Sequence, residues 1–163
     1  MNITDSERTT FQVYPIGFIK RDSGITCIHV MENYRTGLKE LETFSHAQIL
    51  WWCGQTDDEQ KRRILQFDPP FDAPELGVFA SRAPVRPNPI ALSNVIMKRV
   101  DNEKGLIEIR DIDAFDGSPV LDIKPYVPCY CRIAAVTVPS WASAWPESMP
   151  EDGIGLDELP ASP

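Results

Sequence analysis

Short strand-like segments separated by turn-forming residues are the feature of this sequence that most limits its fold. In Ile107-Glu108-Ile109-Arg110, apolar and charged residues alternate as in a strand with one face in solvent. An apolar run at residues 46–53 predicts a central strand. Residues 11–20 and 25–31 predict a hairpin, because the Asp and Gly between them favour a turn. Further strands are expected at residues 77–81, 90–100, 105–111, 120–123 and 129–138.

Helical periodicity is short along the chain. Leu38, Leu41 and Phe44 recur at three-residue spacing, which predicts one or two helical turns, and the charged residues 57–67 predict a helix or a loop. A doubly wound α/β fold is disfavoured, because the gaps between the strands are too short for its helices. We therefore expect a mainly β fold, either a small closed β-barrel or a sandwich, with one or two short helices.

The length of 163 residues suits one domain, and the composition changes at both ends. Residues 1–10 are polar, and we expect a flexible N-terminus without a secretory signal. Residues 11–138 would form the β-barrel domain, and residues 139–163 an acidic, proline-rich tail with five acids and no Lys or Arg. Trp141 and Trp145 predict either that this tail docks on the body or that it binds a partner and orders on contact.

The formal net charge of −8 argues against a protein coated in cations for wrapping nucleic acid. Without the tail the charge is only −3, so the sequence is compatible with a local basic site. No run approaches the roughly 18 apolar residues that span a membrane. Four cysteines without a secretory signal suggest buried thiols in a reducing cytoplasm. Cys129-Tyr130-Cys131 and the two histidines fit no common zinc spacing, so we expect no metal.

The stretch Ser81-Arg82-Ala83-Pro84-Val85-Arg86-Pro87-Asn88-Pro89-Ile90 is the densest unusual segment. Proline fixes its own φ and restricts the preceding residue, so Arg86 and Asn88 are held on a stiff strut. Two guanidinium groups at Arg82 and Arg86 suit a carboxylate or a phosphate. The alternative is a rigid turn whose arginines pair with acids such as Asp113 or Glu75.

A second segment, residues 116–126, opens with an Asp-Gly turn and continues as a strand. Asp122, Lys124 and Tyr126 recur there at period two, so they share one face. That face is either a solvated edge or one wall of a polar site.

Together these motifs resemble a known family. Gly77-Val78-Phe79-Ala80-Ser81-Arg82, Arg86-Pro87-Asn88-Pro89-Ile90-Ala91-Leu92-Ser93 and the segment 116–126, with Phe44-Ser45-His46 upstream, resemble the TsaA-like family, which includes the TrmO tRNA methyltransferases and VirR-like proteins. The resemblance covers roughly residues 13–135. It implies a small β-barrel, usually dimeric, that binds S-adenosylmethionine. In TrmO the methyl group goes to N6 of the threonylcarbamoyladenosine beside the tRNA anticodon.

The resemblance also implies site residues where the motifs match. The implied cofactor contacts are Arg82, Leu92, Asp116, Gly117, Ser118, Pro119, Gly54 and Gln55. Arg86, Asn88 and Lys124 are the expected substrate contacts, and Asp122, Tyr126 and His46 are candidates for a general base. For His46 the alternative is a histidine that closes a helix or opens a strand beside Ser45.

The chain departs from the longer members after its first strand. They carry a loop there with a Pro-Arg-Gln-like element that contacts the cofactor, and this chain has only residues 21–24. Tyr34-Arg35 or a second subunit are the expected replacements. The leading expectation is a homodimeric, S-adenosylmethionine-dependent tRNA methyltransferase. The alternatives are methylation of a small metabolite and a non-catalytic S-adenosylmethionine-binding regulator.

Overall fold

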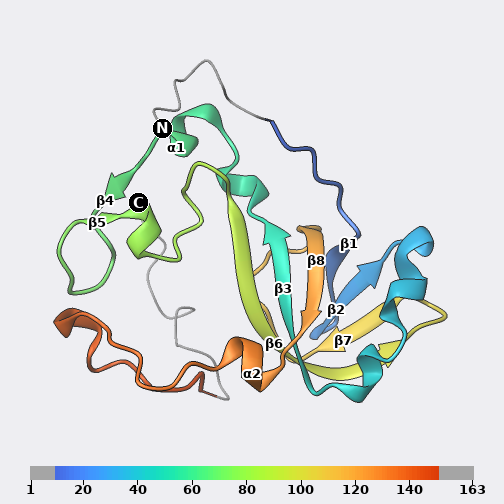
Figure 1. The fold of residues 1–163 in the computed structure, drawn as a ribbon. Coiled ribbons are helices and arrows are strands. Elements are labelled where there is room, and N and C mark those ends of the chain that lie inside the picture. The colour runs from blue at the N-terminus through green and yellow to red at the C-terminus, as the bar shows by residue number, and fades with distance from the viewer. Residues whose placement is uncertain (1–9, 151–163) are drawn as a thin grey trace. The chain divides into compact units, whose positions relative to one another are not determined.

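Six antiparallel strands close into a barrel in the order β1-β2-β7-β6-β3-β8 (Figure 1). The structure, a computed structural model, describes residues 10–150. The barrel strands are β1 (Gly17–Asp22), β2 (Ile25–Val30), β3 (His46–Trp52), β6 (Ile90–Asp101), β7 (Leu106–Ile109) and β8 (Pro119–Pro125). This closure decides between the two predicted architectures in favour of the barrel, and the expected mainly β fold is confirmed.

Alternation along the strands fills the barrel with branched apolar side chains. Ile19, Ile28, Ile49, Ile107 and Val120 are fully buried, one from each of five strands. Because successive side chains of a strand point to opposite faces, the residues between them lie on the outside. The barrel interior is therefore a packed core, and its outer faces and its ends are the surfaces that remain for ligands.

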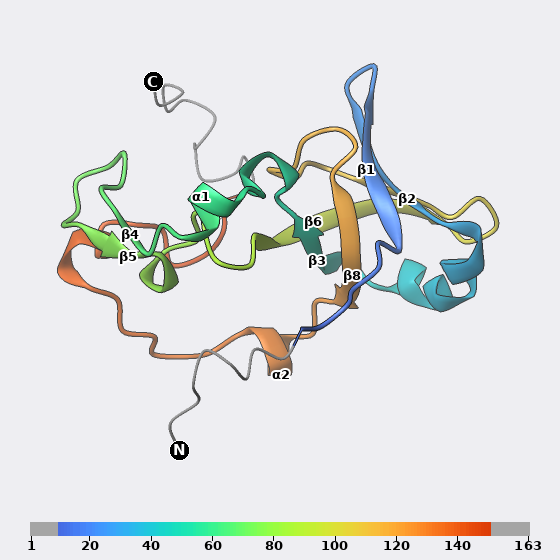
Figure 2. The ribbon, with the colours of Figure 1, turned by 90° about the horizontal axis from the view of Figure 1, so that it is seen from above.

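The β1–β2 hairpin forms as predicted. Ser23 and Gly24 have φ of 49° and 80°, the left-handed values that a two-residue turn of type I′ requires. The tip of this hairpin stands out from the barrel (Figure 2). The first strand begins at Gly17 rather than at residue 11, and Phe11, Val13 and Tyr14 are exposed before it.

Two predicted strands are wrong. Residues 77–81 form the end of the short strand β5 (Leu76–Gly77) and then the 3-10 helix η5 (Val78–Ala80). Residues 129–138 hold no strand; the helix α2 (Pro128–Cys131) begins there instead, with proline in its first turn, where no N–H is needed. Cys129 is consequently exposed, which contradicts its expected burial, whereas Cys53 is buried.

The chain divides into two compact units. One unit comprises residues up to 54 and residues 90–126, which include the barrel, and the other comprises residues 55–89 and residues from 127 onward. The second unit contains α1 (Glu59–Arg62), the strand pair β4 (Gln66–Phe67) and β5, η5, α2 and η6 (Ser140–Ala142). The remaining 3-10 helices are η2 (Glu32–Leu38), η3 (Leu41–Thr43) and η4 (Gly54–Thr56).

An aromatic cluster anchors the last described segment within the second unit. The rings of Trp141 and Trp145 lie 5.9 and 5.5 Å from that of Phe71, and 5.5 Å from each other. The tryptophans therefore dock on the body, as the first of the two predictions had it. Nearly all of the expected flexible N-terminus and residues 151–163 of the expected tail lie outside the described residues, and the domain boundaries stay predictions. Between residues 10 and 150, no helix has the length and apolar character needed to cross a membrane.

Candidate functional site

The outer face of β3, β6 and β8 gathers several of the predicted site residues. Ile49 and Trp51 are buried, so Leu50 points outward between them. Leu50 pairs with Leu92 on β6 and with Asp122 on β8. One outward row therefore runs Leu92, Leu50, Asp122, with a carboxylate beside two apolar side chains.

The next row of this face is polar. It consists of Asn94, Gln48 and Lys124, and Gln48 Nε2 donates to Asn94 Oδ1 at 3.1 Å. Lys124 Nζ lies 2.7 Å from Asp122 Oδ2, and this hydrogen bond and the charge of Asp122 raise the pKa of Lys124. The two side chains thus form an ion pair at neutral pH. Both stay accessible, at 59% and 45% exposure for Lys124 and Asp122.

The predicted turn Asp116–Pro119 lies at the same end of the barrel as Leu92. Gly117 has φ of 78°, and its N–H donates to Ile19 O at 2.8 Å. Asp116 Oδ1 accepts from the backbone N–H of Arg21 at 2.9 Å. Val120, directly after the turn, pairs with Trp51, the neighbour of Leu50. The backbone of the turn is therefore fixed to β1, and one oxygen of Asp116 is already used.

A hydrogen-bonded chain that the sequence reasoning missed supports this end of the barrel. Trp51 Nε1 donates to Ser93 Oγ at 2.9 Å, and Ser93 Oγ donates to Asp113 Oδ1 at 2.6 Å. Ser93 is the last residue of the predicted motif 86–93. Its place in that motif was the sequence signal that could have identified it. The sequence indicated Asp113 only as a partner of an arginine.

His46 and Tyr126 lie together, away from Leu92 and Asp122. Tyr126 N donates to His46 O at 2.9 Å, and their rings are 6.3 Å apart. The His46 ring also shares a 2.7 Å hydrogen bond with Ser45 Oγ. His46 opens β3, as the alternative interpretation had it, and it lies four residues from Leu50, roughly 13 Å along the strand.

The other predicted residues of the motif 81–90 belong to the second unit. Arg82 and Asn88 are exposed there, as is Gln55. The half-buried Arg86 donates to Ala83 O at 3.3 Å and to Val78 O at 3.4 Å. These acceptors are carbonyl oxygens of its own loop rather than Asp113 or Glu75, so this arginine stabilises the loop. The predicted site residues therefore belong to two different units. Those in the barrel unit include Gly54, Leu92, residues 116–119, Asp122 and Lys124.

Arg35 lies at the wrong end of the barrel to replace the missing loop. Its guanidinium donates to Glu103 O at 3.1 Å, in the turn between β6 and β7. Leu92 lies at the opposite end of β6. Across residues 10–150 there is also no group of three or more His, Cys, Asp or Glu side chains placed to hold a metal ion.

Cysteine reactivity should follow the observed burial. We expect iodoacetamide at pH 7 to label exposed Cys129 before Cys27, because burial and the charge of Glu108 raise the pKa of the Cys27 thiol. The Cys27 rate should then rise as the pH increases and more thiolate forms. Peptide mass spectrometry after timed labelling measures both rates. Faster labelling of Cys27 at pH 7 would contradict this ordering.

Comparisons with known proteins match this chain to a methyltransferase family model and to proteins named for S-adenosyl-L-methionine binding. A family model described as the tRNA-methyltransferase O N-terminal domain matches residues 6–131. A probable S-adenosyl-L-methionine-binding protein of Archaeoglobus fulgidus is 38% identical over 99 residues, which cover 61% of this chain and 25% of that protein. A probable S-adenosyl-L-methionine-binding protein of Methanocaldococcus jannaschii is 34% identical over 116 residues, covering 70% of this chain and 90% of that protein.

A solved structure is also similar. TrmO from Pseudomonas aeruginosa superposes with a TM-score of 0.62 and 29% identity over 79% of this chain and 61% of that one. The chain thus spans a quarter of the Archaeoglobus relative and less than two thirds of the TrmO chain.

Proposed function

The chain belongs to the family of the tRNA-methyltransferase O N-terminal domain, and from this membership we propose that it transfers a methyl group from S-adenosylmethionine to tRNA. The observation that carries the proposal is the match over residues 6–131, which contains all six barrel strands and both motifs. The curated relatives, named as S-adenosyl-L-methionine-binding proteins, support the cofactor. The proposed acceptor is N6 of threonylcarbamoyladenosine in the anticodon loop.

The cofactor is assigned to the barrel end that carries Leu92, Gly54 and residues 116–119. S-adenosylmethionine combines an adenine ring with a ribose diol, a sulfonium and an amino acid. The exposed Leu92 and its neighbour Leu50 offer apolar surface to the adenine, and we propose that the edge of the adenine meets the turn around Gly117. Arg82 and Gln55 stay proposed cofactor contacts because they match the family's motifs, with Arg82 on the carboxylate. The proposed substrate contacts are Arg86, Asn88 and Lys124.

Asp122 is the best candidate for the base among the three predicted residues. It lies in the same cross-strand row as Leu92, with Leu50 between them, so it is two strand spacings, roughly 10 Å, away. His46 and Tyr126 lie at the far end of the face. Methyl transfer is an in-line displacement, so alignment supplies much of the rate, and a carboxylate there would accept the proton of the attacking nitrogen.

We further propose a cytoplasmic homodimer. The tRNA substrate favours the cytoplasm. Exposed apolar side chains after the barrel favour an interface, because Tyr130, Ile133 and Val136 are 86%, 76% and 64% exposed. A second subunit would also supply the cofactor contact that is missing because the β1–β2 turn is short.

Incubation with radiolabelled S-adenosylmethionine tests the proposed function. We expect label in tRNA that carries threonylcarbamoyladenosine and none in tRNA that lacks it, with nucleoside analysis locating the methyl group at N6. Label in a metabolite extract instead would favour methylation of a small molecule. The net charge of −8 favours that alternative, because an acidic protein attracts nucleic acid weakly. Cofactor binding by calorimetry with no labelled acceptor would favour a regulator.

A further inference from the structure

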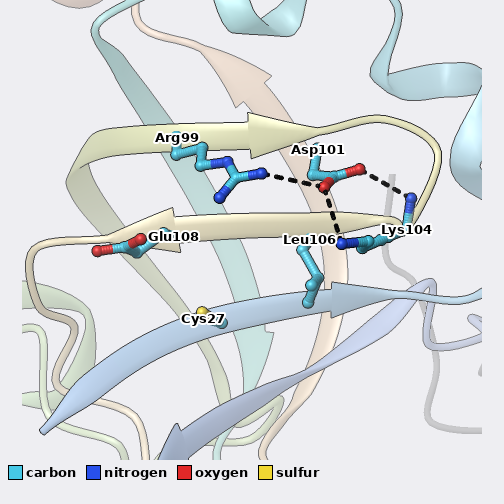
Figure 3. A pocket seen from close by; sticks show the side chains of 6 residues that line it. All are labelled: Cys27, Arg99, Asp101, Lys104, Leu106 and Glu108. Carbon is cyan, nitrogen blue, oxygen red and sulfur yellow. Dashed lines mark hydrogen bonds and ion pairs between the residues drawn. The ribbon is translucent and has the colours of Figure 1, made fainter.

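A second outer face of the barrel, on β1, β2, β7 and β6, collects cations around a small pocket. Figure 3 shows this pocket, of about 100 Å³, lined by Cys27, Arg99, Asp101, Lys104, Leu106 and Glu108. Strand pairing places Lys20, Cys27, Glu108 and Arg99 in one row across the four strands. The face is separate from the row that contains Leu92 and Asp122.

A β-bulge creates the charge density of this face. The register between β6 and β7 shifts between Met97 and Arg99, so that Met97 points into the core while Lys98 and Arg99 are both exposed. A regular strand would send one of these two neighbours inward. Bulges commonly re-aim a side chain in this way. Two consecutive cations therefore stand opposite Glu108.

The cations outnumber the acids and are held loosely. Lys98 Nζ is 3.8 Å from Glu108 Oε1, and Arg99 and Lys104 lie 3.4 and 3.8 Å from the same oxygen of Asp101. Asp101 is only 19% exposed, whereas Arg99 and Lys104 are each 70% exposed. With Lys20, the face has four cations, and its carboxylates are Asp101, Glu108 and Asp22, which follows Lys20 on the same side of β1. This leaves a local excess of one positive charge in a chain with net charge −8.

The basic triplet in the second unit has no such excess. Arg62 lies 2.6 Å from Asp57, Lys61 lies 3.1 Å from Asp58, and Arg63 contacts Glu59. Each of these cations is matched by one acid nearby. A polyanion gains little from a site that is already neutralised.

We propose that the face formed by Lys20, Lys98, Arg99 and Lys104 binds the phosphate backbone of the RNA substrate. The inference rests on the proposed function, since it names how the same enzyme holds its tRNA. Exposed guanidinium and ammonium groups suit phosphate oxygens, and an anion in the pocket would meet Arg99 and Lys104 on either side of Asp101 (Figure 3). The neutral thiol of Cys27 adds no repulsion, because its pKa is raised by burial and by Glu108.

The full chain carrying Arg99→Gln and Lys104→Gln tests this face. Loss of two phosphate contacts should weaken tRNA binding on the order of 10-fold at 0.1 M salt and reduce the slope of log K against log salt by about 1.4 to 1.8. The matched control, Arg63→Gln with Arg132→Gln, removes two exposed cations from the second unit and should leave both values near those of the unaltered protein. Fluorescence anisotropy with labelled tRNA over a salt series measures both.

A gain of affinity provides a result that a folding defect cannot imitate. Glu108→Gln removes an acid from the centre of the row and should tighten tRNA binding several-fold. If the Arg99/Lys104 variant bound tRNA as tightly as the control while tRNA methylation persisted, the proposed phosphate-binding face would be wrong. The proposed function would then still hold. Failure of the unaltered protein to bind or methylate tRNA would overturn both.

Discussion

Asp122→Asn should lower the rate constant of methyl transfer by about 10²- to 10⁴-fold, the usual range for loss of a positioned general base. The carboxylate lies next to Leu50 and two strand spacings from Leu92, on the face where we propose that the methyl group and the acceptor nitrogen meet. Asparagine keeps the size and an acceptor oxygen for Ile123 N, which donates to Asp122 Oδ1 at 2.9 Å. We therefore expect little change in cofactor affinity. Single-turnover assays with labelled cofactor, together with calorimetry, separate the two quantities.

The control for this variant is Asp22→Asn at the tip of the β1–β2 hairpin. It makes the same chemical change on another exposed residue of the barrel unit and should leave turnover unchanged. His46→Gln and Tyr126→Phe should likewise retain most of the single-turnover rate. If either of them lost the rate while Asp122→Asn kept it, the base would lie at the other end of the face.

Gly105→Ala should strongly destabilise the barrel unit. Gly105 has φ of 69°, and a Cβ there would lie 2.5 Å from Val30 O and 2.7 Å from Arg35 Nε. The left-handed conformation costs about 1 to 2 kcal/mol for alanine, and overpacking adds about 1 to 3 kcal/mol. We expect a loss of about 3 kcal/mol, or roughly 6 to 12 °C in Tm for a domain of this size.

Gly24→Ala separates the two contributions. Gly24 has φ of 80°, yet nothing lies within 4 Å of its added Cβ. This variant should therefore show only the conformational cost of about 1 to 2 kcal/mol. Urea denaturation of both variants measures the difference. Equal losses at the two positions would mean that the backbone near Val30 relaxes and that the close contact has no cost.

The barrel strands were predictable because one face of each is buried. In Ile107-Glu108-Ile109-Arg110, the alternation reports the two environments directly, and the structure places Ile107 and Ile109 in the core. The segment 129–138 is richer in apolar residues but has no partner strand; Ile133 and Val136 are exposed, and Pro128 starts a helix. Composition alone does not distinguish an apolar strand from an apolar segment that is left uncovered.

The site was predictable as far as local sequence defines it. The period of two correctly placed Asp122 and Lys124 on one face, and the Asp-Gly turn forms as expected. What could not be predicted depends on pairing between distant strands. Ser93 meets Asp113 through tertiary contact, and Leu92 and Asp122 share a row only because both pair with Leu50 on β3. The bulge that exposes Lys98 with Arg99 is a property of two strands.

The chain's path through its two units has a consequence for synthesis. The unit that contains Phe71 also requires Trp141, and the strands β6, β7 and β8 lie between them in sequence. At the usual rate of translation, roughly 4 to 14 s separate these two residues. All barrel strands are thus synthesised while the aromatic cluster still lacks two of its three rings. A nascent chain arrested before residue 141 should expose Phe71 to chaperones, and release of the last segment would end that exposure.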